Sequence, residues 1–87
     1  MEKETYEQLK QFDNQELEKI GEYIIGEYVP ESSIPFYRYY KLPNEMIIVQ
    51  HYDYSTNKGK LYTLEGEFVG NTNKSGYIKI YKNNSFI

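Results

Sequence analysis

The 87-residue chain contains no cysteine, no tryptophan and no alanine, and it has only one histidine and one arginine. Without cysteine there is neither a disulfide framework nor a thiolate nucleophile, and a lone histidine cannot supply a zinc site. Its apolar runs are short, Met46–Val49 being one of them, so no segment is predicted to cross a membrane. The first residues, Met1-Glu2-Lys3-Glu4, lack the basic and apolar regions of a signal peptide. We therefore expect a cytoplasmic protein that carries no metal and no other cofactor.

Motifs for catalysis and for phosphate binding are also missing. The six glycines form neither G-x-G-x-x-G nor G-x-x-x-x-G-K-[ST], and no G-x-S-x-G nucleophile elbow occurs. His51 and Asp53 fall on the same face of a predicted strand, but such neighbours lie about 7 Å apart, beyond hydrogen-bond reach. The sequence therefore predicts a protein that is not an enzyme and has no catalytic residues.

Tyrosine is the residue that the chain has in excess. Eleven tyrosines stand against five leucines, whereas leucine, alanine and glycine lead the composition of average domains. Tyrosine offers a large contact area with few rotatable bonds, which favours it in strands and at interfaces. However, nine lysines, one arginine and no alanine are also typical of an AT-rich genome, such as that of a low-GC bacterium or its phage. Genome composition is thus a competing explanation for part of the tyrosine count.

Charge is unevenly distributed along the chain. Residues 1–35 carry nine acidic residues and three lysines, a net charge of -6, while residues 36–87 carry a net charge of +3. The length allows one domain, 1–87. We expect it to divide into an acidic helical part, 1–26, and a basic antiparallel sheet, 36–82.

Apolar residues recur at helical spacing from about Lys3 to Ile25 and project onto one side of a helix. These residues are Tyr6, Leu9, Phe12, Leu17, Ile20, Tyr23 and Ile24. Asp13 and Glu16 have the spacing of a capping box, which could restart the helix at Asn14. The segment is therefore either one helix of about six turns or two short helices that meet at Asp13. Gly26 and Pro30 are expected to end it.

After a connecting loop at 27–35 the apolar pattern changes to a period of two, which predicts strands. The predicted strands are 36–42, 45–54, 60–64, 68–69 and 77–82, with 45–54 as the central strand and 71–76 as a polar loop. Short connections favour an antiparallel meander. The predicted fold class is α+β, with the N-terminal helix or helices packed on one face of a four- to five-stranded antiparallel β-meander.

Alternation along the strands predicts which side chains the helix leaves uncovered. Ile78 and Ile80 are expected to face the helix, together with Phe36, Tyr40 and Leu42, which places Arg38 on the inner face or at an edge. The open face then carries tyrosines beside lysines. The candidate partner-binding residues are Tyr37, Tyr39, Lys41, Tyr77, Lys79 and Tyr81.

Exposed tyrosine is a favoured contact residue in protein interfaces. We therefore expect a non-enzymatic protein that binds and inhibits or sequesters a partner macromolecule, most simply another protein. A phage- or mobile-element-encoded inhibitor of a host protein, of the anti-defence or immunity type and acting in the host cytoplasm, fits the size, the acidity and the composition. An alternative binding surface is an acidic helix face that could meet a basic groove, made of Glu4, Glu7, Glu18 and Glu22.

Two other functions remain open. A nucleotide-like ligand could be captured in a pocket of Tyr and Lys side chains, which a homodimer would enclose more fully. Single-stranded nucleic acid could lie on the open face, with bases stacked on tyrosines and phosphates beside lysines. The isoelectric point of about 5.1 disfavours nucleic acid, because nucleic-acid-binding domains usually have a marked basic excess.

Overall fold

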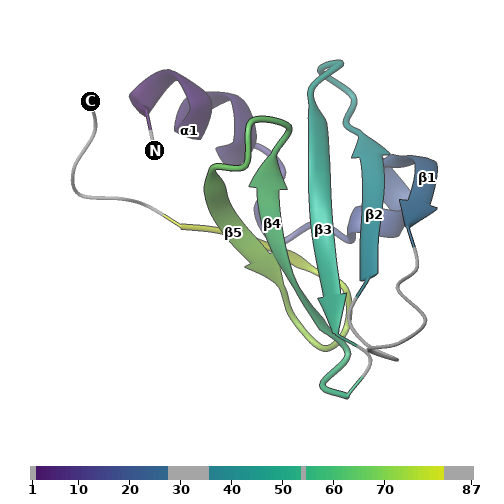
Figure 1. Cartoon of the computed structure of the whole chain (residues 1–87). Helices are drawn as coiled ribbons and strands as arrows, with labels where there is room; N and C mark the ends of the chain where they lie inside the picture. The colour runs from purple at the N-terminus through teal and green to yellow at the C-terminus, as the bar shows by residue number, and fades with distance from the viewer. Residues whose placement is uncertain (1, 28–35, 54, 82–87) are drawn as a thin grey trace.

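The structure is a computed structural model that describes residues 2–27, 36–53 and 55–81 (Figure 1). Two short helices, α1 (Lys3–Lys10) and α2 (Leu17–Ile20), precede six strands that pair in chain order, each antiparallel to the next. The strands are β1 (Glu22–Glu27), β2 (Phe36–Lys41), β3 (Ile47–Asp53), β4 (Lys58–Thr63), β5 (Phe68–Thr72) and β6 (Ile78–Ile80). The predicted α+β class with a meander sheet is confirmed, and the sheet has six strands rather than four or five. No helix in the described ranges has the length and apolar character needed to cross a membrane.

The helical part is interrupted after α1. Asn14 adopts the left-handed conformation with a φ of 66°, which no continuous right-handed helix accommodates. The Asp13 side chain does not cap a helix: its Oδ1 accepts a hydrogen bond of 2.8 Å from the backbone N–H of Ile80, and α2 begins only after Glu16. Two short helices are therefore the correct alternative, and the predicted capping box is wrong because Asp13 has a partner on a distant strand.

The last part of the predicted helix is the edge strand β1. Glu22 pairs with Lys41 and Tyr23 with Tyr40, so the backbone of β1 is hydrogen-bonded to β2 rather than within a helix. Gly26, expected to end a helix, lies inside this strand, and Tyr23, expected on a buried helix side, is 56% exposed. Glu27, predicted to begin the connecting loop, is the last residue of β1, and the rest of that loop, 28–35 with Pro30, falls outside the described residues.

Each of the strands β2 to β6 overlaps the residue range predicted for it. β3 occupies a central place in the sheet, as expected. β5 is longer than predicted because it includes Asn71 and Thr72, which the sequence predicts to lie in a loop. Thr72 is only 1% exposed, and its hydroxyl is hydrogen-bonded to Gln50 and to the carbonyl of Gly59. These contacts compensate for burying a polar side chain. Tyr54 and Lys82, at the ends of two predicted strands, are not among the described residues.

One face of the sheet is covered by the helical part, which lies behind the sheet in Figure 1. Leu9, Phe12 and Leu17 pack against the inner face, and Ile78 and Ile80 belong to the same core as predicted. The remaining buried members of this core are Tyr40, Leu42, Ile48, Leu61 and Val69. Burial of these side chains is the main favourable term that holds the helices to the sheet.

The β6 edge of the sheet is covered by the segment that joins the two helices. The backbone N–H of Ile78 donates to the carbonyl of Gln15 at 2.8 Å, and the N–H of Asn14 donates to the carbonyl of Ile78 at 2.7 Å. Glu16 forms a further bridge with Tyr77. A covered edge cannot pair with another chain, so these bonds protect β6 from edge-to-edge association.

Candidate binding face of the sheet

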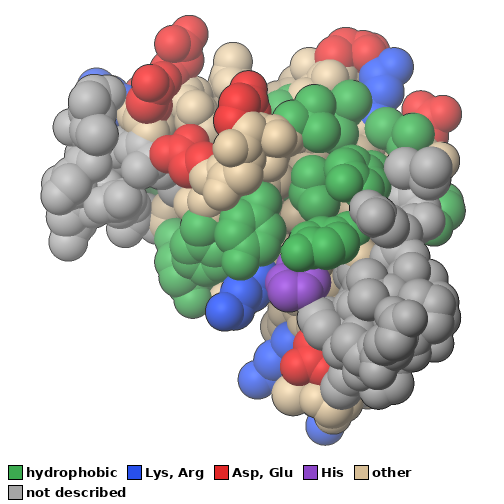
Figure 2. Space-filling view, in the orientation of Figure 1, with side chains coloured by type: hydrophobic (Ala, Val, Ile, Leu, Met, Phe, Trp, Pro, Cys, Tyr) green, Lys and Arg blue, Asp and Glu red, His purple; other side chains and the backbone are tan. Residues whose placement is uncertain are grey.

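Apolar and aromatic side chains form a row across the face of the sheet opposite the helices. Tyr39, Val49 and Tyr62 lie opposite one another on β2, β3 and β4, and Phe68 of β5 lies opposite Tyr62. The ring of Phe68 contacts Tyr62 and Tyr81 edge-on, with centroid distances of 5.6 and 5.1 Å. We call these five residues the aromatic row. Figure 2, in the orientation of Figure 1, shows hydrophobic side chains (green) gathered on this side of the molecule.

A second row runs beside the first and is more polar. Tyr37, His51, Lys60, Asn71 and Lys79 are paired in register from β2 to β6, and we call them the polar row. The Tyr37 and His51 rings stack at 4.6 Å with an interplanar angle of 14°. The amide Nδ2 of Asn71 donates to the Tyr81 hydroxyl at 3.1 Å, which ties the two rows together.

The rings of this face are accessible to a partner. Phe68 is 38% exposed and Tyr81 48%, although large apolar groups gain free energy when they are buried. A shallow hollow of about 480 Å³ is bordered by Tyr37, Tyr39, Val49, His51, Tyr62 and Leu64. A second hollow of about 450 Å³ is bordered by His51, Asp53, Lys58, Lys60, Asn71 and Asn73. The face therefore offers aromatic contact area next to positive charge.

The structure separates the six predicted partner-binding residues into two groups. Tyr37, Tyr39 and Lys41 belong to β2, whereas Tyr77, Lys79 and Tyr81 belong to β6 and its flanks. Four strand spacings, or roughly 19 Å, lie between these two strands. Two of the lysines are paired: Lys41 lies 2.7 Å from the Glu45 carboxylate, and Lys79 donates to the Asn14 side chain. The hydrogen bond to Glu45 raises the pKa of Lys41.

Sequence reasoning missed the residues between these two groups. They are His51, Lys60, Tyr62, Phe68 and Asn71. Alternation could have identified two of them, because Lys60 and Tyr62 flank Leu61, which is fully buried. Phe68 and Asn71 were harder to assign because the register shifts between β4 and β5 near Leu61 and Tyr62.

His51 and Asp53 each contact a different neighbour. His51 stacks on Tyr37, while the Asp53 carboxylate accepts hydrogen bonds from the Ser55 hydroxyl at 2.7 Å and the Ser55 N–H at 2.9 Å. These bonds lower the pKa of Asp53. Within the described part of the chain, no three His, Asp or Glu side chains lie close enough together to hold a metal ion.

The alternative acidic surface is not one helical stripe. Glu4 and Glu7 lie in α1, Glu18 lies in α2, and Glu22 lies in β1. The four residues therefore do not share one helix, because the helical part is interrupted after α1 and ends before Glu22. Their role as an alternative binding surface stays a prediction. Glu18 is also engaged, since its carboxylate lies 3.6 Å from the Arg38 guanidinium.

Comparison of the chain with protein-family models, with curated proteins and with solved structures gives no match. The case for a function therefore depends on the chemistry of the surface itself.

Proposed function

We propose that the protein is a non-enzymatic binding protein that holds another protein on the open face of its sheet and thereby blocks that partner. The observation that carries this proposal is the aromatic row, whose Phe68 and Tyr81 rings are exposed on one face while the other face is covered by α1 and α2. Exposed aromatic surface of this kind is typical of protein interfaces.

The aromatic row is suited to binding because its rings already support one another. Phe68 is held edge-on between Tyr62 and Tyr81, and Asn71 fixes the Tyr81 hydroxyl. Rings that are ordered before binding lose less conformational entropy in the complex. The energetic centre of the interface is therefore expected near Phe68.

The charges beside the aromatic row indicate the chemistry of the partner. Lys58 and Lys60 border the hollow beside His51, and both are exposed. A complementary partner places apolar side chains over the aromatic row and carboxylates opposite these lysines. Charge complementarity of this kind mainly raises the association rate and the specificity.

An inhibitory role follows from this mode of binding, because a small domain that occupies a partner's surface excludes other molecules from it. The acidic character, the small size and the composition typical of an AT-rich genome support a phage- or mobile-element-encoded inhibitor. This part of the proposal rests on analogy with small acidic inhibitors rather than on a motif.

Single-stranded nucleic acid is the second candidate, and the Tyr37–His51 stack next to Lys60 is the observation that favours it. Bases stack on aromatic rings while phosphates meet neighbouring cations. A nucleotide-like ligand would use the same chemistry in the hollow beside Lys58 and Lys60. A salt-dependent gel shift with single strands tests the first alternative, and a thermal shift with nucleotides tests the second.

The experiment that tests the main proposal is a quantitative pull-down from host lysate, with and without nuclease. The bait is compared with a variant in which Tyr37, Tyr39 and Tyr81 are all replaced by Ala, and with a control carrying Glu4→Gln and Glu7→Gln on α1. We expect one protein to be enriched by the wild type and the control, in the presence of nuclease, and to be lost with the folded triple variant. Equal enrichment by all three baits would exclude the open face, and enrichment that nuclease abolishes would favour nucleic acid.

A further inference from the structure

The charges of the open face and its turns are separated by sign along the strands. Acidic residues lie at the end where β2 is joined to β3 and β4 to β5, and they are Glu22, Glu45, Glu65 and Glu67. Basic residues lie toward the opposite end, and they are Lys58, Lys60 and Lys79. Figure 2 shows red side chains along the upper side of the green ones and blue side chains along the lower side. The aromatic row therefore crosses the face between an acidic end and a basic end.

Two charged residues depart from this polarity, and each has an opposite charge close by. Lys41, at the acidic end, lies 2.7 Å from the Glu45 carboxylate. Asp53, at the basic end, lies opposite Lys58 in the register of β3 and β4. The sign of each end is therefore set by the remaining residues.

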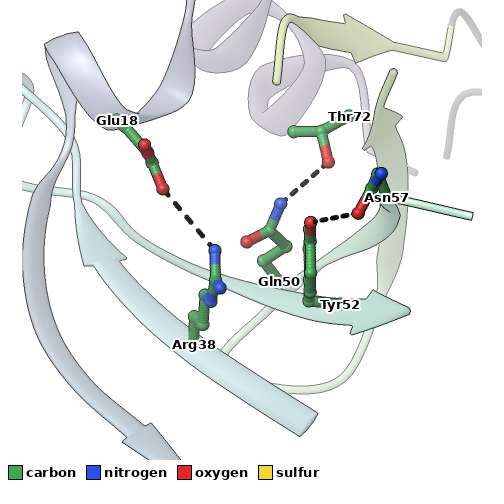
Figure 3. Close-up of polar contacts among 6 residues, drawn as sticks. All are labelled: Glu18, Arg38, Gln50, Tyr52, Asn57 and Thr72. Carbon is green, nitrogen blue, oxygen red and sulfur yellow. Dashed lines mark hydrogen bonds and ion pairs between the residues drawn. The ribbon is translucent and has the colours of Figure 1, made fainter. Parts of the chain in front are cut away.

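Within the described part of the chain, the inner face offers no comparable surface, because the helical part covers it and polar side chains beside α2 bind one another (Figure 3). Arg38 lies opposite Gln50 on this inner face, and its guanidinium is 3.6 Å from the Glu18 carboxylate. The Gln50 amide donates to the Thr72 hydroxyl at 2.8 Å. Apolar contact area for a second molecule is therefore concentrated on the open face.

A two-fold axis can bring two open faces together in two ways that keep the strands of both sheets aligned, which is a usual arrangement of packed sheets. An axis parallel to the strands places acidic end on acidic end and lysines on lysines. An axis along the aromatic row reverses the strand direction, so the acidic end of each copy meets the basic end of the other. Tyr62 and Phe68 then meet their own counterparts, and Glu65 of each copy comes opposite Lys60 of the other. Both of these charges are exposed and form no ion pair within the described part of the chain.

We propose that the open face binds a second copy of this chain, with the two-fold axis along the aromatic row. The occupant is a second copy because the charge pattern of the face is complementary to itself in this arrangement. The dimer also covers Phe68 and Tyr81, which are 38% and 48% exposed, and burial of large apolar groups is favourable. This inference goes beyond the proposed function, since the dimer needs no other protein and a partner that binds the open face must displace the second copy.

The size of the face predicts a weak dimer. Strands β2 to β6 span roughly 19 Å, and the chain from Lys58 to Leu64 spans roughly 20 Å along the strand direction. The projected area is thus roughly 400 Å², compared with about 800 Å² buried by each partner in a standard interface. We therefore expect a dissociation constant in the micromolar range or above, so that a partner with higher affinity can displace the second copy.

Sedimentation velocity of the purified chain at low salt, from about 10 µM to about 1 mM, tests the dimer without any other protein. We expect the sedimentation coefficient to rise with concentration from the value of a monomer to that of a dimer, and the dissociation constant to increase with salt. A monomer at every concentration would overturn this inference and would leave the proposed function standing.

Two charge reversals at exposed positions test the direction of the axis. Lys60→Glu and Glu65→Lys should each weaken the dimer by roughly tenfold or more, because each brings like charges together at both symmetry-related contacts. An equimolar mixture of the two variants should associate again, because opposite charges then face each other at both contacts. Phe68→Ala should also weaken the dimer, whereas Tyr23→Ala on the edge strand β1 is the control and should leave it unchanged.

Three outcomes would contradict this dimer. If the mixture associates no more tightly than either variant alone, Glu65 does not lie opposite Lys60. If Lys60→Glu binds the wild type more tightly than the wild type binds itself, lysine faces lysine and the axis is parallel to the strands. If Phe68→Ala leaves the dissociation constant unchanged, the copies associate through another surface.

Discussion

Replacing Gly70 by Ala is expected to destabilise the protein strongly, because the β5–β6 pair leaves no space for a methyl group. A Cβ built on Gly70 would lie 2.1 Å from the carbonyl oxygen of Lys79 and 3.0 Å from the Cα of Ile80, both backbone atoms. Since backbone cannot turn aside like a long side chain, β6 must move away from β5. That movement breaks the pairing of Gly70 with Ile80 and the 3.0 Å hydrogen bond from Tyr81 N–H to the Val69 carbonyl.

The magnitude follows from these losses. Two backbone hydrogen bonds contribute about 1 kcal/mol each, and overpacking a core costs about 1–3 kcal/mol. The free energy of unfolding should therefore fall by about 3–5 kcal/mol, a large part of the 5–15 kcal/mol typical of a domain. Urea unfolding followed by circular dichroism measures this change.

Gly66→Ala is the matched control for this substitution. Gly66 has a φ of +91°, but no atom lies within 4 Å of the position that its Cβ would occupy. Only backbone strain of about 1–2 kcal/mol is expected there. If Gly70→Ala lowers the free energy of unfolding by no more than Gly66→Ala, the argument from the close approach of β5 and β6 is refuted.

Three further predictions concern single contacts. Asp13→Ala removes the acceptor of the Ile80 N–H, so the free energy of unfolding in urea should fall by about 1–3 kcal/mol. Asp13→Asn keeps an acceptor oxygen and should lower the free energy of unfolding by less. Equal losses in the two variants would count against the contact. Because hydrogen bonds from Ser55 lower the folded-state pKa of Asp53, its contribution to stability is present above the unfolded pKa of about 3.9 and is lost as the pH falls further. Asp53→Asn should therefore lose less stability than the wild type between pH 7 and pH 3 (both measured by urea midpoint), and identical losses would refute the assignment. Arg38→Lys keeps the charge but loses the flat guanidinium over the Tyr52 ring, so the free energy of unfolding should fall by about 1 kcal/mol, whereas an unchanged value would contradict the contact.

The sheet from residue 36 onward could be predicted because its signal is local. Alternation placed Tyr40, Leu42, Ile78 and Ile80 on the inner face, and short polar turns implied antiparallel neighbours. The breaks in the amphipathic segment could not be predicted in the same way, because their causes lie elsewhere in the chain. Asp13 is turned toward the backbone of Ile80 on β6.

β1 shows the same limit of sequence reasoning. Tyr23 and Ile24 continue the helical spacing of the preceding residues, and only pairing with β2 makes this segment a strand. The adjacent β-branched residues Ile24 and Ile25, followed by Gly26, are a weak local signal for a strand. The candidate binding face could be predicted only at its two ends, since register across strands decides which side chains of β3, β4 and β5 fill the middle.

The most direct measurement compares Phe68→Ala and Tyr23→Ala in their affinity for the isolated partner, by calorimetry. Phe68 lies within the aromatic row, whereas Tyr23 is more exposed but lies on the edge strand β1, where its ring contacts Tyr40 edge-on. If the open face is the binding surface, Phe68→Ala should weaken binding by 2 kcal/mol or more, or about thirtyfold. Tyr23→Ala should change the affinity by less than about twofold. Comparable effects of the two substitutions, or a larger effect of Tyr23→Ala, would contradict the assignment of the open face.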